Sequence, residues 1–257
     1  MKDNQNLVEM KNIYKYFGTV TALRNVDFQV KNKEILGLVG DNGAGKSTLI
    51  KILTGVFPPD QGEIFFEGKK IKLAFPKNAR DLGIETVYQN LALIDLMSIA
   101  RNFFLGREPV KALAGVVSVL DKKKIEKVTE TVLKDIGINV RSVDEEVSIL
   151  SGGERQSVAI GRAIHFGAKL LVLDEPTAAL SIKESHKVLN YVLEAKKRGL
   201  SVIFITHNIY HVYSVADRFT ILEHGEKLGD FRKDEVCTDD LIEVIRTGKK
   251  IEKKNNK

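Results

Sequence analysis

The stretch GDNGAGKST at residues 40–48 holds residue types that bind phosphate groups. A glycine, four further residues and then Gly-Lys-Ser fit the pattern of a phosphate-binding loop. Glycines let backbone N–H groups come close to an oxyanion, where a Cβ atom would clash. Lys46 would reach the β- and γ-phosphates of a nucleotide, and the Ser47 hydroxyl would bind Mg²⁺. The structural alternative is a glycine-rich turn that holds a surface lysine.

The segments on either side of this stretch favour phosphate binding. Residues 34–39 predict a short buried strand, and residues 48–53 predict a helix that Gly55 ends. A strand, a glycine-rich turn and a helix start bring several N–H groups to one point, with the positive end of the helix dipole behind them. The sequence therefore predicts a site for a nucleoside triphosphate.

Two carboxylates follow a second predicted strand. Residues 170–173 are continuously apolar, as in a strand covered on both faces of a parallel sheet, and Asp174 and Glu175 come next. Ligands of such sheets bind at the carboxyl ends of the strands. Asp174 would hold Mg²⁺ through water, and Glu175 would polarise the attacking water. An apolar strand ending in Asp-Glu is also common as a structural feature, so this interpretation depends on the nearby phosphate-binding loop.

A histidine follows the next predicted strand, residues 202–205. His207 therefore falls at the same sheet edge, where its ring could donate a hydrogen bond to a γ-phosphate or could only cap a helix. The other histidines fall on predicted helices or in a turn, and we expect no role in the site for them: His165, His186, His211 and His224.

The stretch LSGGERQ at residues 150–156 places a serine and two glycines at the start of a helix predicted over residues 154–166. A helix start of this kind offers N–H groups and a hydroxyl to an anion. Together with the phosphate-binding loop and the Asp-Glu strand, it resembles the ATP-binding cassette ATPases from residue 7 to about residue 229. The resemblance implies an α/β fold: a P-loop NTPase with a RecA-like parallel core, an N-terminal antiparallel β subdomain and an inserted helical subdomain.

The resemblance also assigns roles to single residues. Phe17 would stack on adenine, with Tyr16 as the rival for that role and packing in the core as the alternative. Gln89 would contact Mg²⁺ and link the core to the helical subdomain. Ser151 and the two glycines after it would bind the γ-phosphate of ATP held by a second subunit. The working unit would then be a homodimer with two ATP molecules between its subunits.

The implied site has three parts. The catalytic residues are Lys46, Gln89, Glu175 and His207, and the Mg²⁺ ligands are Ser47, Gln89 and Asp174. The nucleotide-binding residues are Phe17, Gly40, Asp41, Asn42, Gly43, Ala44, Gly45, Lys46, Ser47, Thr48, Ser151, Gly152, Gly153 and Glu154. One position departs from the common family pattern, because Ser181 stands where the loop after the acidic pair often ends in Asp.

Further stretches resemble the ATPases of bacterial importers of simple sugars such as ribose, xylose or fructose: residues 87–93, 100–108, 174–181 and 207–212. Ser181 is usual in that subfamily. The resemblance implies a peripheral ATPase at the cytoplasmic face of the membrane, coupled to permease subunits and, through them, to an extracytoplasmic sugar-binding protein. The permease would dock near residues 91–104. A soluble ATPase of iron–sulfur cluster assembly and the ATPase of an exporter are the alternatives, and a cassette that binds ATP without cleaving it is disfavoured by intact catalytic residues.

Sequence periodicity predicts the remaining elements. Strands within residues 7–39 and 63–66 suggest a small antiparallel sheet, and residues 91–165 are expected to be mostly helical. One of these helices would begin after Asp121 and end at Gly137. We expect a single domain over residues 1–257, with its core at about 7–90 and 166–229, a helical subdomain at about 91–165, and a C-terminal helix and basic tail at 230–257.

Composition narrows the functional classes. Apolar residues make up 43% and charged residues 29%, as in soluble globular proteins. With no long apolar run and a polar start, the chain is expected in the cytoplasm unless a partner holds it at a membrane. The single cysteine, Cys237, excludes an internal disulfide and is expected to pack as a small residue. The net charge of +6 lies partly in a tail expected to be solvated, and the few aromatic residues give no support for a nucleic-acid partner.

Overall fold

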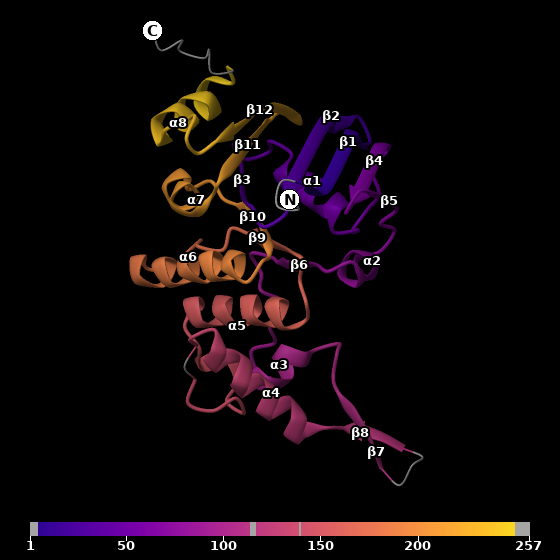
Figure 1. The fold of residues 1–257 in the computed structure, drawn as a ribbon, viewed down its shortest axis with the longest axis vertical. Coiled ribbons are helices and arrows are strands. Elements are labelled where there is room, and N and C mark those ends of the chain that lie inside the picture. Colours follow the sequence, from indigo (N-terminus) through magenta and orange to yellow (C-terminus); the bar gives the residue numbers. More distant parts are fainter. Residues whose placement is uncertain (1–4, 114–116, 139, 250–257) are drawn as a thin grey trace.

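The phosphate-binding stretch follows one strand of a six-stranded sheet (Figure 1). The structure is a computed structural model that describes residues 5–113, 117–138 and 140–249. Five strands pair in parallel: β3 (Ile35–Val39), β6 (Ile84–Val87), β9 (Leu170–Asp174), β10 (Ser201–Ile205) and β11 (Arg218–Glu223). The sixth, β12 (Glu226–Arg232), is antiparallel to β11, and the strand order is β12-β11-β3-β10-β9-β6. All five parallel strands therefore end at the same edge of the sheet.

Each face of this sheet has its own apolar core, because alternate side chains of a strand point to opposite faces. In β9, Leu170 and Val172 belong to one buried cluster, whereas Leu171 and Leu173 belong to another. A strand covered on both faces is apolar throughout, which is the pattern that predicted it. The strands expected at residues 170–173 and 202–205 are thus confirmed.

An antiparallel sheet and a helix cover one face of the parallel sheet. The strands are β1 (Asn6–Phe17), β2 (Val20–Lys31), β4 (Gln61–Phe66) and β5 (Lys69–Ile71), in the order β2-β1-β4-β5. Their inward side chains share a buried cluster with α1 (Lys46–Leu53), and α2 (Pro76–Asp81) follows β5. The expected antiparallel sheet is confirmed, and β1 and β2 are each 12 residues long.

On the other face lie α6 (Ile182–Lys197), α7 (Ile209–Val215) and α8 (Thr238–Thr247), and α5 (Gly152–His165) contributes further side chains to the same buried cluster (Figure 1). Cys237 is the N-cap residue of α8 and is exposed, so the expectation that it packs in the core is wrong. The tail expected to be solvated lies, from residue 250 onward, outside the described residues. Among the described helices, none is long and apolar enough to cross a membrane.

The segment between β6 and β9 has a third buried cluster of its own. It contains α3 (Ile99–Phe104), α4 (Lys122–Asp135), the short 3₁₀ turn η1 (Val147–Ile149) and α5 (Gly152–His165). Asp121 caps α4 by accepting a hydrogen bond from Lys124 N, as the sequence predicts.

One part of this segment is not helical. Between α3 and α4, β7 (Val110–Leu113) and β8 (Val117–Leu120) pair as an antiparallel hairpin that projects from the helices (Figure 1). The expectation that residues 91–165 are mostly helical is therefore wrong for this stretch. Val110 is 62% exposed and Leu120 is 40% exposed, so these apolar side chains do not form the buried face of a helix.

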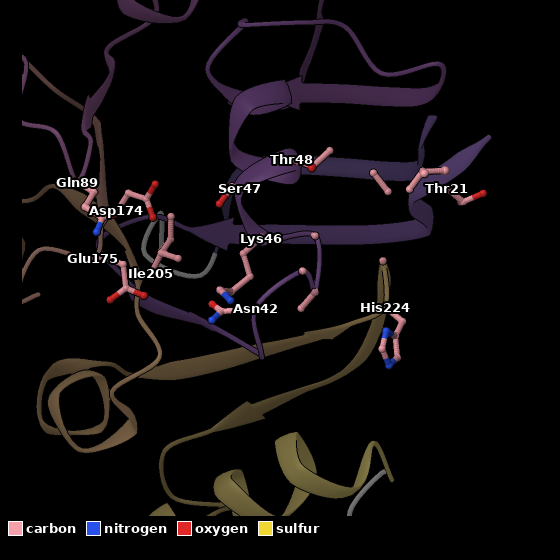
Figure 2. A pocket seen from close by; sticks show the side chains of 16 residues that line it. Thr21, Asn42, Lys46, Ser47, Thr48, Gln89, Asp174, Glu175, Ile205 and His224 are labelled. Atoms are coloured by element: carbon pink, nitrogen blue, oxygen red, sulfur yellow. The ribbon is translucent and has the colours of Figure 1, made fainter. Parts of the chain in front are cut away.

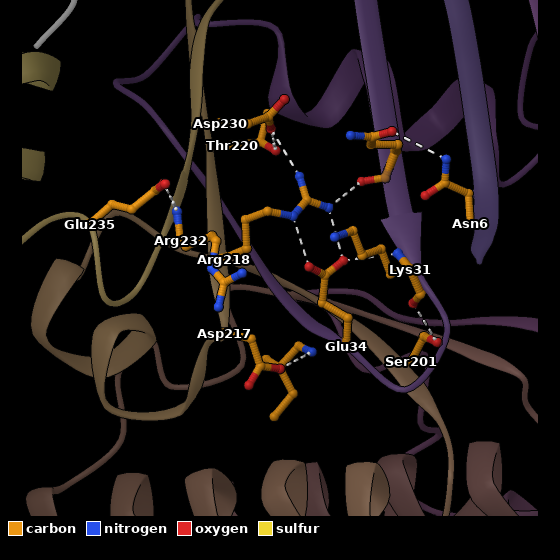
Figure 3. Close-up of polar contacts among 12 residues, drawn as sticks. Asn6, Lys31, Glu34, Ser201, Asp217, Arg218, Thr220, Asp230, Arg232 and Glu235 are labelled. Atoms are coloured by element: carbon orange, nitrogen blue, oxygen red, sulfur yellow. Dashed lines mark hydrogen bonds and ion pairs between the residues drawn. The ribbon is translucent and has the colours of Figure 1, made fainter. Parts of the chain in front are cut away.

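A buried ion pair joins the elements at the opposite edge of the sheet (Figure 3). Arg218 Nε donates to Glu34 Oε1 at 2.8 Å, and Arg218 Nη2 donates to Glu34 Oε2 at 2.9 Å. The same guanidinium donates to the carbonyl of Gln29 at 2.8 Å and to Asp230 Oδ1 at 3.1 Å. Arg218 stands in β11, and its partners come from β2, the turn before β3 and β12, so one side chain joins both sheets at this edge.

Candidate functional site

A cavity of about 500 Å³ opens at the edge where the parallel strands end (Figure 2). The loop after β3 and the start of α1 contribute residues 42–48, the loop after β6 contributes Gln89, and the end of β9 contributes Asp174 and the next residue, Glu175. Figure 2 shows Gln89, Asp174 and Glu175 on one side of Lys46 and His224 on the other. Residues more than 130 positions apart thus meet because parallel strands direct their C-terminal ends to one edge.

Lys46 lies folded along its own loop. It is buried, and its Nζ donates to the carbonyls of Gly40 at 2.7 Å and Asp41 at 2.9 Å. Burial lowers the pKa of Lys46, and the nearby carboxylates of Glu175, Asp41 and Asp174 oppose that shift. An ammonium satisfied only by carbonyl oxygens and facing a cavity is a ready partner for an anion.

The outer glycines of the loop are required by packing as well as by ligand access. A Cβ atom on Gly40 would lie 2.1 Å from the carbonyl oxygen of Leu222 in β11. A Cβ atom on Gly45 would lie 2.8 Å from the side chain of Leu23 in β2. At Gly43, by contrast, a Cβ atom would meet nothing within 4 Å, so this part of the loop is open.

The two acidic residues stand in different surroundings. The pKa of Asp174 is raised by burial and then by the neighbouring charge of Glu175. Glu175 has a left-handed backbone with φ of 50°, which turns the chain sharply at the end of β9. Its Oε1 accepts a hydrogen bond from His207 N at 3.0 Å and lies 2.9 Å from His207 Nδ1. Its Oε2 accepts from the Thr206 hydroxyl at 3.0 Å.

His207 therefore contacts Glu175 and does not line the cavity itself. It follows β10 as expected, but it is not among the residues that line the cavity, and its side chain is 70% exposed. Both the ring Nδ1 and the backbone N–H of His207 lie against Glu175 Oε1.

Two groups of lining residues were missed by sequence reasoning. Val20, Thr21 and Ala22 come from the start of β2, and His224 and Gly225 come from the turn between β11 and β12. The position of His224 in a turn predicts no role in the site, yet His224 lines the cavity. The hairpin is real, but β11 also pairs in parallel with β3, which brings its end to the site. The sequence does not indicate that β11 runs parallel to β3, and this direction is what places His224 at the cavity.

The aromatic candidates for base stacking lie near the cavity's β2 side. Phe17 is 47% exposed and packs edge-on against Phe57, with ring centroids 5.3 Å apart. Tyr16 is 41% exposed and stacks on Tyr14. Neither ring is among the residues that line the cavity, so position alone does not identify either of them as the ring that stacks on adenine.

The LSGGERQ stretch forms the start of α5. Ser151 accepts a hydrogen bond from Glu154 N at 3.3 Å, and Glu154 accepts one from Ser151 N at 2.9 Å, which is a capping box. The helix begins at Gly152, two residues earlier than predicted. None of Ser151, Gly152, Gly153 and Glu154 lines the cavity that holds Lys46. The two groups of residues that the sequence predicts to bind phosphate therefore lie apart in one chain.

A second cavity, of about 270 Å³, lies between β6, α2 and the loops around α3. Tyr88, Ala92 and Leu105 are among its lining residues. The stretch at residues 91–104, expected to form a docking groove, is divided: Ile99, Phe103 and Phe104 are buried in the third cluster. Ile94 and Leu96 are exposed, at 46% and 81%.

The fold and the first cavity define a P-loop ATPase of the cassette type. A model of the ABC transporter family matches residues 23–178. The chain belongs to the ABC transporter family, as its ATP-binding and ATP-hydrolysing cassette.

Relatives and solved structures agree with this assignment. The chain is 44% identical to the xylose/arabinose import ATP-binding protein of Sulfolobus acidocaldarius, over 93% of this chain and 94% of that one. It is 46% identical to the fructose import ATP-binding protein of Rhizobium meliloti, over 86% of each. The ADP conformation of an ABC transporter cassette superposes with a TM-score of 0.81 at 27% identity, covering 99% of this chain and 100% of that one. A dimeric bacterial cassette gives 0.73 at 26% identity, covering 88% and 98%.

Proposed function

We propose that this protein is the ATPase subunit of an importer for a simple sugar. The observation that carries the proposal is its similarity, over most of both chains, to two import ATP-binding proteins named for xylose/arabinose and for fructose. The alternatives, an ATPase of iron–sulfur cluster assembly or of an exporter, have no comparable support.

In the proposed site, the phosphates of ATP replace the carbonyl partners of Lys46 and lie against the N–H groups of residues 42–48. The donor set also fits Mg²⁺. Among the described residues no cluster of three or more His, Cys, Asp or Glu could hold a metal alone, so the ion would depend on the phosphates. Ser47, Gln89 and Asp174 line the cavity and offer oxygen ligands, and a cation there would offset the crowded negative charge of Asp174 and Glu175.

For hydrolysis, we assign Glu175 to orient and polarise the attacking water, and His207 to hold Glu175 and reach toward the γ-phosphate. Thr206 and His207 already fix both oxygens of the carboxylate. Catalysis of this kind is mainly positioning and charge stabilisation, with Mg²⁺ supplying charge at the phosphates when bound.

The second group of residues calls for a second subunit. Ser151, Gly152 and Gly153 stand at the start of α5, separate from the cavity, and in the proposal they bind the γ-phosphate of ATP held by a partner copy of the chain. The dimeric cassette to which the chain is similar supports such a pair. Two ATP molecules would then lie between two identical subunits.

The division of the chain supports a coupling role. We propose a core at about residues 7–90 and 166–229, a mainly helical subdomain at about 91–165, and a C-terminal part from 230. The third buried cluster, within the inserted segment, supports its movement as a unit. Membrane permease subunits, served by an extracytoplasmic sugar-binding protein, would dock at the second cavity and hold the ATPase at the cytoplasmic face of the membrane.

A pull-down tests the proposal. The bait is the Glu175→Gln protein with Mg-ATP, incubated with detergent extracts of native membranes, and a Lys46→Ala bait serves as the control that cannot hold the phosphates. Recovery of a multi-span permease with the first bait is the expected result. Recovery of soluble proteins alone would contradict the importer assignment and leave the ATPase assignment standing.

A further inference from the structure

One carboxylate joins the starts of α5 and α6. Glu184, in the first turn of α6, accepts hydrogen bonds at Oε2 from the Ser181 backbone N–H at 3.1 Å and from the Ser181 hydroxyl at 2.7 Å. Its other oxygen, Oε1, accepts one from Gly153 N at 3.3 Å. A capping box on α6 needs only the first of these oxygens. The second oxygen, Oε1, reaches across to Gly153, the glycine that we propose to bind the γ-phosphate of the partner's ATP.

The approach of Glu184 to Gly153 depends on the absence of a side chain there. A Cβ atom at position 153 would lie 2.9 Å from both Cβ and Cγ of Glu184. Beside it, a Cβ atom on Gly152 would lie 2.9 Å from the side chain of Leu180. The two glycines thus let the loop that ends at Ser181 pack directly on the start of α5.

The carboxylate is held in its charged form. Hydrogen bonds from the Ser181 hydroxyl, from the backbone N–H groups of Ser181 and Gly153, and from Ser151 lower the pKa of Glu184 to about 2. A negative charge therefore stands beside the Gly153 N–H at every physiological pH. The contact resembles the one that a phosphate oxygen would make with the same N–H group.

We propose that Glu184 is a positioning residue that competes with the γ-phosphate of the partner's ATP for the N–H of Gly153. The inference rests on the proposed homodimer and adds a residue that sets its ATP requirement. Closure of the dimer displaces Oε1 from Gly153, and the charge of Glu184 opposes the incoming phosphate. Oε2 stays on Ser181, at the end of the loop that begins with Glu175, so occupancy of one ATP site is linked to the backbone next to the other.

A purely structural role makes a different prediction. If Glu184 only caps α6, removing its charge should affect helix stability and leave the ATP requirement of the dimer unchanged. Asp240 provides the matched comparison, because it plays the capping role on α8 by accepting from Cys237 N at 2.8 Å. It lies outside both groups of anion-binding residues.

The test uses the Glu175→Gln chain as the parent, so that ATP is bound and not consumed. Glu184→Gln or Asp240→Asn is added to it, and sedimentation velocity gives the fraction of dimer as Mg-ATP is titrated. Glu184→Gln should lower the ATP concentration at half-maximal dimer about two- to fivefold, the size of an exposed charge interaction. Asp240→Asn should leave that concentration unchanged.

The outcomes separate the two levels of the proposal. An unchanged or higher ATP requirement in Glu184→Gln would overturn the competition by Glu184. A parent chain that forms no dimer with Mg-ATP would overturn the proposed homodimer, and this inference with it. Should the Gln variant fail to fold, Glu184→Asp keeps the charge and the cap on Ser181 but is one methylene shorter. It should also lower the requirement, and no change or a rise would again contradict the proposal.

Discussion

At the scale of single residues, Glu175 is the most constrained side chain of the site. Its backbone is left-handed, its two oxygens accept hydrogen bonds from His207 and Thr206, and its side chain is only 17% exposed. A glutamine side chain has the same shape, and its amide oxygen can accept the hydrogen bond from His207 N. Replacement by glutamine therefore removes the charge with little change of geometry.

Glu175→Gln should lower the rate of ATP hydrolysis by at least about a hundredfold, the range of a lost general base. ATP affinity should stay within a few-fold of the parent, since the residues of the phosphate-binding loop are unchanged. Phosphate release and equilibrium binding of a fluorescent ATP analogue measure the two effects. Unchanged turnover would remove Glu175 from the mechanism.

Asp174 gives a stability prediction with a definite sign. Its folded-state pKa is raised above the ordinary 3.8, so its contribution to stability is fully present below that value and is lost as pH rises through the folded pKa. At pH 7 the ionised carboxylate opposes folding, and Asp174→Asn should raise the melting temperature of the protein without nucleotide, by about 2–4 °C per kcal/mol gained.

With Mg-ATP bound, the parent should have a higher melting temperature than Asp174→Asn. The parent should gain more in melting temperature from Mg-ATP than Asp174→Asn does, because the variant loses a carboxylate that we assign to the ion. Differential scanning fluorimetry with and without Mg-ATP measures both effects. A lower melting temperature of the variant without nucleotide would contradict the assigned strain.

A pair of alanine variants distinguishes between Phe17 and Tyr16 as the residue that stacks on adenine. Stacking on a base contributes about 1–3 kcal/mol, so Phe17→Ala should weaken ATP binding about tenfold or more. Tyr16→Ala, whose ring stacks on Tyr14, is the matched control and should bind ATP as the parent does. Equal affinities in the two variants, measured by isothermal titration calorimetry, would remove the adenine role from Phe17.

At the scale of elements, the start of α5 is fastened to the segment after Gln89. Arg155 donates to Asp95 at 2.8 Å and to the carbonyls of Ser148 at 2.9 Å and Leu150 at 3.1 Å. Buried Asn102 holds the same segment by bonding to both backbone groups of Ile94. The start of α5 is therefore joined by hydrogen bonds to the loop that follows Gln89.

The ion pair between Glu34 and Arg218 joins several strands, and it yields a prediction at this scale. Both side chains are less than a tenth exposed, and removing Glu34 leaves the buried Arg218 guanidinium with Asp230 as its remaining carboxylate partner. Glu34→Gln should lower the free energy of unfolding by about 3 kcal/mol. The matched control is Glu226→Gln, which breaks the exposed pair with Arg24 and should cost less than about 1 kcal/mol.

Urea unfolding followed by circular dichroism measures both variants of this pair. Nucleotide binding by Glu34→Gln should remain, since the ion pair lies at the sheet edge opposite the phosphate-binding loop. Equal costs for Glu34→Gln and Glu226→Gln would show that the buried network does not hold the two sheets together.

At the scale of the whole molecule, the two groups of residues expected to bind phosphate lie apart in one chain. None of the described residues lines both the cavity around Lys46 and the small cavity of about 130 Å³ beside Ser151, Gly153 and Glu184. If both groups of residues bind phosphate as proposed, the two groups serve different nucleotides or come together across a pair of chains. This separation is the physical reason for proposing a dimer.

The second cavity leads to a prediction about the assembly. Leu105 lines it and is 39% exposed, so Leu105→Glu should reduce recovery of permease subunits in the pull-down by about tenfold or more, as loss of a central interface contact would. ATPase activity of the isolated chain should be unchanged. Val110→Glu, on the exposed face of the β7–β8 hairpin, is the control, and equal losses in both variants would argue against docking at this cavity.

The sequence by itself determined the local chemistry. The spacing of Gly40, Gly45, Lys46 and Ser47 specifies a phosphate-binding loop, because that turn needs those residue types in that order. Continuous apolar runs identified β3, β9 and β10, since strands covered on both faces have no polar side to show. The α/β class and the family followed from these local signals and from the LSGGERQ stretch.

Only the tertiary structure decided what lies beside these residues. His224 reaches the cavity because β11 pairs in parallel with β3, and Glu184 reaches Gly153 because two glycines let α6 start against α5. The β7–β8 hairpin also escaped prediction, since its exposed apolar residues carry no periodic signal of burial. Strand direction, helix contact and side-chain reach depend on residues far apart in the chain, so no local pattern encodes them.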